Sequence, residues 1–176
     1  MVLKPDVGER GTGVAIARNE REVHSYLCAA TQDTIIQKYV GGLEFGIFYY
    51  RYPGESPGRI FSITEKRFPV ITGDGQSTLA ELILADERAV CLAALYLARL
   101  RRGPGEVPAA GEAVPLAELG SHCRGAVFLN GASLETEALS AAVDSIARSH
   151  PGFFFGRFDV RSASVEDLQT GRFEVL

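Results

Sequence analysis

The sequence is poor in cysteine, and its cysteines are not spaced as metal or disulfide motifs require. The 176 residues include three cysteines, Cys28, Cys91 and Cys123, and no pair has the CxxC spacing. This argues against a disulfide scaffold or a thiolate zinc site and favours a reducing cytoplasm. Because Cys28 and Cys91 lie in apolar helical patterns, we expect both to be packed in the interior.

Long hydrophobic runs and an excess of positive charge are also lacking. The longest apolar stretch, residues 90–100, is interrupted by Tyr96 and Arg99, so it is too short and too polar to span a bilayer. The first residues do not have the shape of a signal peptide. The formal net charge of −4 provides no basic field for duplex nucleic acid. We therefore predict a cytoplasmic protein with neither a membrane nor a nucleic acid as its partner.

What is present is an ordinary globular composition, with 46% hydrophobic and 23% charged residues, which allows a real core. Apolar periodicity, turn residues and capping signals predict the elements. The predicted strands cover residues 2–3, 13–17, 34–39, 43–52, 59–68, 113–116, 125–129, 153–161 and 172–176. The predicted helices cover residues 19–30, 78–85, 87–101 and 134–149. Because strands and helices do not alternate regularly, we predict an α+β fold of two lobes, hinged near residues 37–42.

Both ends of the sequence look cut. The chain enters a strand directly after Met1 and stops within a strand at Leu176, whereas domains usually have exposed tails at their boundaries. We therefore expect a fragment of a longer protein.

The first cluster with chemical potential is a glycine-rich loop after Lys4. Gly8, Gly11 and Gly13 allow the backbone to approach a ligand and turn its N–H groups inward. A lysine at the end of the preceding strand supplies a point charge for phosphate oxygens. The GxxGxG order leads into a strand, so it is neither a dinucleotide fingerprint nor a P-loop, both of which lead into a helix. A flexible hairpin is the structural alternative.

The second cluster is the extended apolar segment 35–40 followed by Glu44. Such a segment offers backbone groups to an adenine edge, and a glutamate a few residues later can accept hydrogen bonds from both ribose hydroxyls. Taken alone, a buried strand with one surface carboxylate explains this pattern better.

The third cluster lies on the strand over residues 153–161. Strand alternation puts Arg157, Asp159 and Arg161 on one face. The opposite face receives Phe154, Phe158 and Val160. A carboxylate between two arginines suits metal-phosphate chemistry, because the carboxylate can hold Mg²⁺ while an arginine neutralises a transferring phosphoryl group. A surface salt-bridge ladder, completed by Glu174, explains the pattern equally well.

In this order, the three clusters resemble the ATP-grasp superfamily over nearly the whole chain. Members have a lysine-bearing strand, a glycine-rich loop over the phosphates, a hinge strand that holds adenine, and a GR-x-D strand before a terminal Glu-x-Asn strand. The segment FPVITGDGQSTLAELI, residues 68–83, also resembles D-alanine–D-alanine ligase-like carboxylate–amine ligases, including cyanophycin synthetase. The resemblance implies two α+β lobes with mainly antiparallel sheets and a nucleotide cleft between them. The small glycine-loop lobe would be residues 1–37, and the larger, C-terminally truncated lobe residues 38–176.

The resemblance also implies a role for each matching residue. The implied nucleotide ligands are Lys4, Gly8, Gly11, Gly13, Gln37, Tyr39, Val40, Glu44 and Lys66. Within this set, Gln37 departs from the glutamate usual at the adenine amino group, and Glu44 matches the ribose-binding acid. Lys66 and Arg157 are implied in phosphoryl transfer, with Arg67 as the alternative to Lys66, and Asp159 is implied as the first metal ligand. The family's Glu-x-Asn metal ligands would follow Leu176, so we expect an incomplete magnesium site.

The implied function is the ATP-binding module of an ATP-dependent carboxylate–amine ligase that acts through an acyl phosphate. Its cofactors would be ATP and Mg²⁺, and its substrates a carboxylate and an amine from amino acids or peptides, with a homodimer as a candidate assembly. We expect little or no activity from the isolated chain. Within this family, Arg124 would contact phosphate or the acidic substrate. The alternative function is a non-catalytic nucleotide-binding or assembly module.

Overall fold

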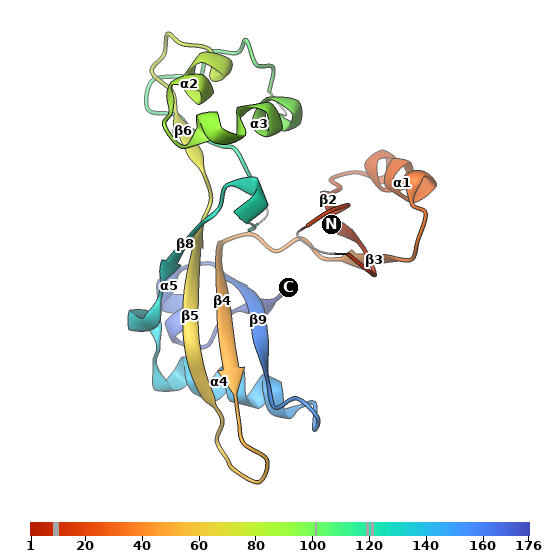
Figure 1. The fold of residues 1–176 in the computed structure, drawn as a ribbon, viewed down its shortest axis with the longest axis vertical. Helices are drawn as coiled ribbons and strands as arrows, with labels where there is room; N and C mark the ends of the chain where they lie inside the picture. Colours follow the sequence, from red (N-terminus) through yellow and green to blue (C-terminus); the bar gives the residue numbers. More distant parts are fainter. Residues whose placement is uncertain (9–10, 101, 119, 121) are drawn as a thin grey trace. The chain divides into compact units, whose positions relative to one another are not determined.

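The chain forms two compact units, Met1–Gly41 and Gly42–Leu176, drawn in Figure 1. This computed structural model describes residues 1–8, 11–100, 102–118, 120 and 122–176. The division falls at the Gly41-Gly42 pair, shortly after the lobe boundary that the resemblance implies. Each unit has its own sheet, so each is described by itself.

The first unit is a small antiparallel sheet with one helix. Strands β2 (Ala15–Ile16) and β3 (Thr34–Gln37) flank β1 (Val2–Pro5), and both pair antiparallel with it. Helix α1 (Glu20–Ala29) begins at the predicted N-cap, because the side chain of Asn19 accepts a hydrogen bond from the amide of Glu22. The order of elements predicted for this part of the chain is therefore confirmed.

The second unit is organised around a five-stranded antiparallel sheet. Its strand order is β10-β9-β4-β5-β8, and every neighbouring pair is antiparallel. The strands are β4 (Leu43–Tyr50), β5 (Arg59–Arg67), β8 (Val127–Asn130), β9 (Phe155–Ser162) and β10 (Glu174–Val175). The prediction of an α+β fold with mainly antiparallel sheets is confirmed.

One face of this sheet forms the core of the second unit, which we call the core face. Phe45, Ile47 and Tyr49 of β4 and Val160 of β9 are fully buried there. Helices α4 (Glu137–Arg148) and α5 (Val165–Gln169) cover this face, since Leu139, Val143, Ala147 and Leu168 belong to the same cluster. Both helices lie behind the strands in the view of Figure 1. The predicted placement of Phe158 and Val160 on the apolar side of β9 is confirmed.

A smaller α+β segment connects β5 to β8. It contains β6 (Val70–Thr72) paired with β7 (Ala113–Pro115), and the helices α2 (Leu79–Ala85), η1 (Ala89–Leu92) and α3 (Ala93–Arg99). Its own small core comprises Ile71, Ile83, Ala89 and Tyr96. Helix α2 begins with the predicted capping box, in which Thr78 and Glu81 satisfy each other's backbone amides.

Several sequence-based expectations are wrong in detail. The single helix predicted over residues 87–101 is divided, because Leu92 leaves helical geometry (φ −125°, ψ 20°) between η1 and α3. The short helix α5 was not predicted, although Ser164 caps it by accepting a hydrogen bond from the amide of Asp167. The helix predicted over residues 134–149 begins instead at Glu137, after the 3-10 turn η3 (Ala132–Leu134).

The expected burial of two cysteines is also wrong. Cys28 and Cys91 are both exposed. Helix α1, which carries Cys28, has no buried residue at all, because its unit is too small to cover it. Cys91 lies in η1, where its thiol is directed at the carbonyl oxygen of Glu87 at 3.8 Å.

Among the described residues, no helix is both long enough and apolar enough to cross a membrane.

Candidate functional site

The face of the five-stranded sheet opposite the core carries five ionised side chains from three neighbouring strands. We call this set the charged face: Glu44, Lys66, Arg157, Asp159 and Arg161. The register explains the grouping, because Glu44 on β4 lies directly opposite Lys66 on β5 and Arg161 on β9. Cross-strand partners share a face and have closely spaced Cβ atoms. The predicted side for Arg157, Asp159 and Arg161 is thereby confirmed.

Glu44 joins the two sides of this network. Lys66 Nζ donates to its Oε1 at 2.9 Å, and Arg161 donates to its Oε2 from Nη2 at 2.8 Å and from Nε at 3.1 Å. The three residues are only 4–5% exposed. A third Arg161 bond, from Nη2 to the carbonyl oxygen of Glu118 at 2.8 Å, fixes the guanidinium further. Buried charges of this kind are tolerated only when paired and hydrogen-bonded.

Asp159 lies at the exposed edge of the network. Its Oδ1 is 3.1 Å from Lys66 Nζ and 3.0 Å from Arg157 Nε. Although both nitrogens are within ion-pair distance, this buried oxygen receives no hydrogen bond of acceptable geometry from the described residues. Buried polar atoms usually have a hydrogen-bond partner. Asp159 Oδ1 therefore lies between two cations, neither of which is aligned to donate a hydrogen bond to it.

Two glycines make room for these side chains. A Cβ atom on Gly46 of β4 would lie 3.3 Å from Arg157 Cδ and 3.5 Å from Asp159 Oδ1, so the absent side chain leaves space at the centre of the charged face. A Cβ on Gly120 would lie 2.2 Å from Glu44 Oε1, so a larger residue here would displace the Glu44 carboxylate from its present position. The backbone at Gly120 consequently covers the Glu44 carboxylate closely.

The charged face has the donor set for a magnesium–phosphate group only in part. Asp159 Oδ1 provides one carboxylate oxygen with no hydrogen-bond donor, and no group of three or more His, Cys, Asp or Glu side chains in the described part of the chain could enclose a metal. Mg²⁺ accepts one or two protein carboxylates when phosphate oxygens and waters supply its other ligands. The residues thus fit a metal that arrives with a polyphosphate, and they do not form an all-protein metal cage.

The first unit brings together two predicted nucleotide ligands that are far apart in the sequence, Lys4 and Gln37. Lys4 Nζ donates to the side-chain oxygen of Gln37 at 2.9 Å. Gly11 and Gly13 have positive φ angles of 73° and 74°, which favour glycine. The hydroxyl of Tyr26 in α1 donates to the carbonyl oxygen of Gly13 at 2.8 Å, so the end of the loop is attached to the helix. Residues 9 and 10 of the predicted phosphate lid lie outside the described residues.

The predicted site residues therefore fall into two groups. Glu44, Lys66, Arg157 and Asp159 meet on the charged face of the second unit. The other group belongs to the first unit: Lys4, Gly8, Gly11, Gly13, Gln37, Tyr39 and Val40. The convergence of the two groups on one cleft stays a prediction, as do the roles assigned to their members.

The sequence did not reveal two features of the network. Arg161 was placed on the correct face, but its pairing with Glu44 was not anticipated, because 117 residues separate them in the chain. The aromatic neighbours were also missed: Phe68 lies 5.5 Å from the Arg161 guanidinium, and Phe128 lies 5.8 Å from Lys66 Nζ. The salt-bridge-ladder alternative agrees with the pairing of the more exposed side chains of Arg157 and Asp159. It does not describe Arg161, which is buried and pairs with Glu44.

Beyond Arg157, the same side of the sheet becomes aromatic. Phe48, which lies opposite Arg157 in the register, contacts Phe61 with a ring-centroid distance of 5.9 Å. Tyr50 contacts both Phe61 and Tyr52 at 6.4 and 5.8 Å. Phe61 and Tyr52 are 74% and 61% exposed.

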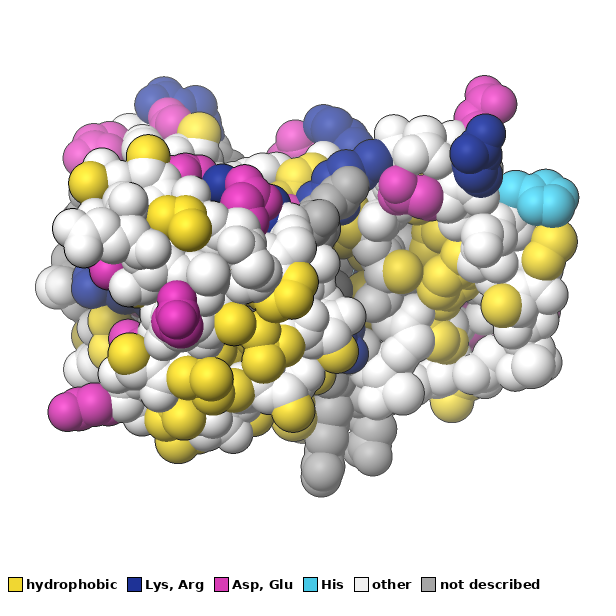
Figure 2. All heavy atoms as spheres, turned by 90° about the horizontal axis from the view of Figure 1, so that it is seen from above, with side chains coloured by type: hydrophobic (Ala, Val, Ile, Leu, Met, Phe, Trp, Pro, Cys, Tyr) yellow, Lys and Arg dark blue, Asp and Glu magenta, His cyan; other side chains and the backbone are white. Residues whose placement is uncertain are grey.

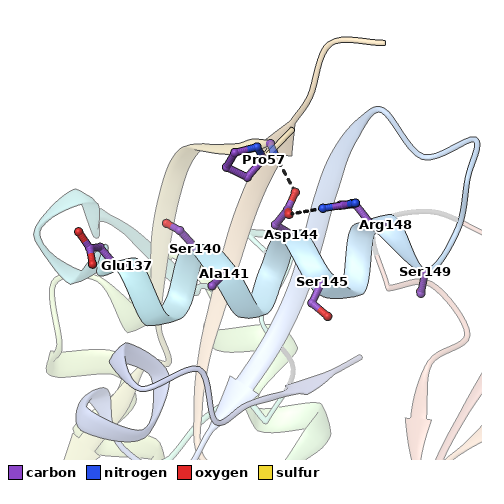
Figure 3. A pocket seen from close by; sticks show the side chains of 9 residues that line it. Pro57, Glu137, Ser140, Ala141, Asp144, Ser145, Arg148 and Ser149 are labelled. Atoms are coloured by element: carbon purple, nitrogen blue, oxygen red, sulfur yellow. Dashed lines mark hydrogen bonds and ion pairs between the residues drawn. The ribbon is translucent and has the colours of Figure 1, made fainter. Parts of the chain in front are cut away.

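A hollow of about 690 Å³ lies elsewhere, between α4 and the turn that joins β4 to β5. Figure 3 shows Asp144 projecting from α4 toward Pro57 of this turn, with Arg148 directed at it from the same helix. The Asp144 carboxylate accepts hydrogen bonds from the Tyr49 hydroxyl at 2.7 Å and the Gly58 amide at 2.8 Å. Burial acts to raise the pKa of Asp144, but these hydrogen bonds and the charge of Arg148 outweigh it and lower the pKa overall.

The pKa of Tyr49, whose hydroxyl donates to Asp144, shifts in the opposite direction. Burial, followed by the hydrogen bond to Asp144, raises the pKa of Tyr49 to about 12. Both donors to Asp144, Tyr49 and Gly58, belong to the sheet and its connecting turn. This acid therefore stabilises the packing of α4 on the sheet.

Acidic and basic side chains are interspersed on the surface shown in Figure 2, where magenta and dark-blue side chains lie beside one another. The fold and the site define an α+β protein whose larger unit carries a partly buried ion-pair network on an antiparallel sheet.

Comparison with known proteins finds similarity among solved structures. No protein-family model matches the chain, and no curated protein matches its sequence. Among solved structures, the chain is similar to a bifunctional glutathione synthetase from Pasteurella multocida, with 15% sequence identity and a TM-score of 0.47. The similarity covers 99% of this chain and 26% of that protein, so the chain spans about a quarter of its length.

Proposed function

We propose that the chain is a nucleotide-binding module of the ATP-grasp type, which binds the polyphosphate of magnesium–ATP at the charged face. The observation that carries this proposal is the position of Lys66. Its amine lies between the Glu44 and Asp159 carboxylates, 2.9 and 3.1 Å away, beside an Asp159 oxygen without a hydrogen-bond donor. A fixed cation next to an incompletely satisfied carboxylate suits a phosphate chain that carries its own metal.

The roles proposed on the charged face follow from exposure. The side chains of Arg157 and Asp159 are 56% and 34% exposed, so both can reach a ligand from solvent. Arg157 would pair with phosphoryl oxygens, for which the planar guanidinium is suited. Asp159 would hold Mg²⁺, which when bound would neutralise charge on the phosphates. Lys66 would supply a second positive charge from within the sheet.

The first unit would complete nucleotide binding. Lys4 lies at a strand end and can provide a point charge, and Gly8, Gly11 and Gly13 would allow backbone amides to face the phosphates. Gln37, Tyr39 and Val40 would offer side-chain and backbone groups to adenine. This part of the proposal depends on the order in which the three motifs follow one another in the sequence. It also requires the two units to close on one nucleotide.

For the parent protein we propose ATP-dependent ligation of a carboxylate to an amine. A carboxylate oxygen would attack the γ-phosphorus of ATP and release ADP, forming an acyl phosphate. The amine would then attack the carbonyl carbon, release inorganic phosphate and lose its proton to give the amide. Positioning and charge neutralisation would be the protein's contribution, as in other phosphoryl transfers. The rival proposal is a non-catalytic nucleotide-binding or assembly module.

Two measurements test the proposal. Calorimetry of the chain with magnesium–ATP should show binding, weaker for magnesium–GTP because the hinge would offer adenine-type pairing. Absence of any ATP binding would overturn the nucleotide-binding proposal. Hydroxylamine trapping, over a panel of amino acids, should detect no acyl phosphate with residues 1–176 alone. It should detect one with the full-length parent protein and its substrate. Failure with the parent protein would favour the non-catalytic rival.

A further inference from the structure

Glu44 lies at the centre of the charged face, and both of its oxygens already have cationic partners. Oε1 accepts from Lys66 at 2.9 Å, and Oε2 accepts from Arg161 at 2.8 and 3.1 Å. Hydrogen bonds in which both partners are ionised are shorter and about twice as strong as neutral ones. The residue is 4% exposed, so these pairs are little weakened by solvent.

The backbone of Gly120 also lies close to Oε1 of this carboxylate. The position of a Cβ on Gly120 would be 2.2 Å from Glu44 Oε1 and 3.0 Å from Lys66 Cδ. A sugar hydroxyl brought to Oε1 would meet this segment. It would also compete with Lys66 or Arg161 and leave a buried cation without its counter-ion, which is strongly unfavourable.

From this geometry we infer that Glu44 is a positioning residue, a buried counter-ion that holds Lys66 and Arg161 on the charged face, and is not a ligand of the ribose. The inference rests on the proposed function and replaces the ribose role that the family resemblance implies for Glu44. Its consequence is that the polyphosphate, rather than the sugar, supplies the contacts at this part of the site. Lys66, held from behind by Glu44, is directed toward Asp159.

The first test uses the unmodified chain and therefore does not depend on the folding of a variant. Calorimetry compares magnesium–ATP with magnesium–2′,3′-dideoxy-ATP. Equal affinities are expected, because Glu44 makes no contact with the ribose hydroxyls. If Glu44 binds the ribose, the dideoxy nucleotide should bind about tenfold or more weakly, and that result would overturn the inference while leaving the proposed function intact. If ATP itself does not bind, the proposed function fails, and this inference fails with it.

The second test separates a counter-ion from a merely structural residue. Glu44→Gln removes a negative charge beside Lys66, so magnesium–tripolyphosphate, which has no ribose, should bind at least about threefold more tightly. ATP affinity should change by the same factor. The matched control is Glu65→Gln on β5, the strand of Lys66. Its carboxylate pairs with Arg67 at 2.7 Å on the opposite side of the sheet, so its two affinities should equal those of the unmodified chain. Unchanged or weaker tripolyphosphate binding by folded Glu44→Gln would contradict the counter-ion role.

Discussion

Alternate residues of β4 are buried equally but by different forces. Phe45, Ile47 and Tyr49 are fully buried on the core face by apolar packing, whereas Glu44 is 4% exposed on the charged face and is held by ion pairs. Burial of apolar surface is favourable in itself. Burial of an ion pair often breaks even at best, because desolvation offsets the attraction between the charges. The core face therefore accounts for most of the stability, and the charged face is the candidate for a function that requires fixed charges.

Truncation of the core face should have the largest effect. Phe45→Ala removes a fully buried ring and should lower the free energy of unfolding by about 3–5 kcal/mol, from lost burial and the cavity that remains. Urea denaturation followed by circular dichroism measures this change. The matched variant Phe61→Ala removes a ring that is 74% exposed and should cost less than about 1 kcal/mol. Similar losses for the two variants would contradict the division into two faces.

A smaller, pH-dependent effect should appear at Asp144. Asp144→Asn should cost about 1–3 kcal/mol at neutral pH, because the ionised acceptor of the Tyr49 and Gly58 bonds is lost. Since the folded-state pKa of Asp144 lies below its ordinary value, its stabilisation is complete above about pH 4. It is lost as the pH falls through the folded-state pKa. Stability measured from pH 7 to pH 2 should therefore converge for the variant and the unmodified chain at the acid end, and a constant difference would refute this account.

Substitution of Asp159 should change ligand affinity more than stability, which is the reverse of the effect expected at Asp144. Asp159→Asn should change the free energy of unfolding by less than about 1 kcal/mol, since the side chain is 34% exposed and such ion pairs contribute little. Its magnesium–ATP affinity should fall about tenfold, because the proposed metal ligand is lost. Calorimetry at several Mg²⁺ concentrations measures this effect. Asp144→Asn serves as the control and should bind magnesium–ATP normally; a loss at Asp144 with none at Asp159 would relocate the site.

The smallest expected effect concerns the first unit. Lys4→Ala should leave stability within about 0.5 kcal/mol, because the half-buried lysine has one hydrogen bond, to Gln37 at 2.9 Å. Its magnesium–ATP affinity should fall about threefold to tenfold, since the loop and Lys4 would contribute one of several phosphate contacts. Arg21→Ala, at an exposed position of α1, controls for the loss of a positive charge in this unit. Equal affinities for Lys4→Ala and Arg21→Ala would remove Lys4 from the site.

Local patterns accounted for most elements and for the side on which residues lie. Capping signals at Asn19 and Thr78 marked helix starts that the structure confirms, because a cap depends on residues only three apart. Alternation along β9 placed Arg157, Asp159 and Arg161 together for a similar reason. The predicted helix over residues 87–101 was wrong because the break at Leu92 has no glycine or proline to signal it.

The sequence by itself determined the alternation of charged and apolar residues on the strands, the glycine-rich loop after Lys4 and the α+β class. These depend on interactions between residues close in the chain. Only the tertiary structure decided that Glu44 pairs with Lys66 and Arg161, and that Gly120 covers it. Strand order and register join segments more than a hundred residues apart, and a local pattern shows which face a residue occupies without showing which residue lies opposite it.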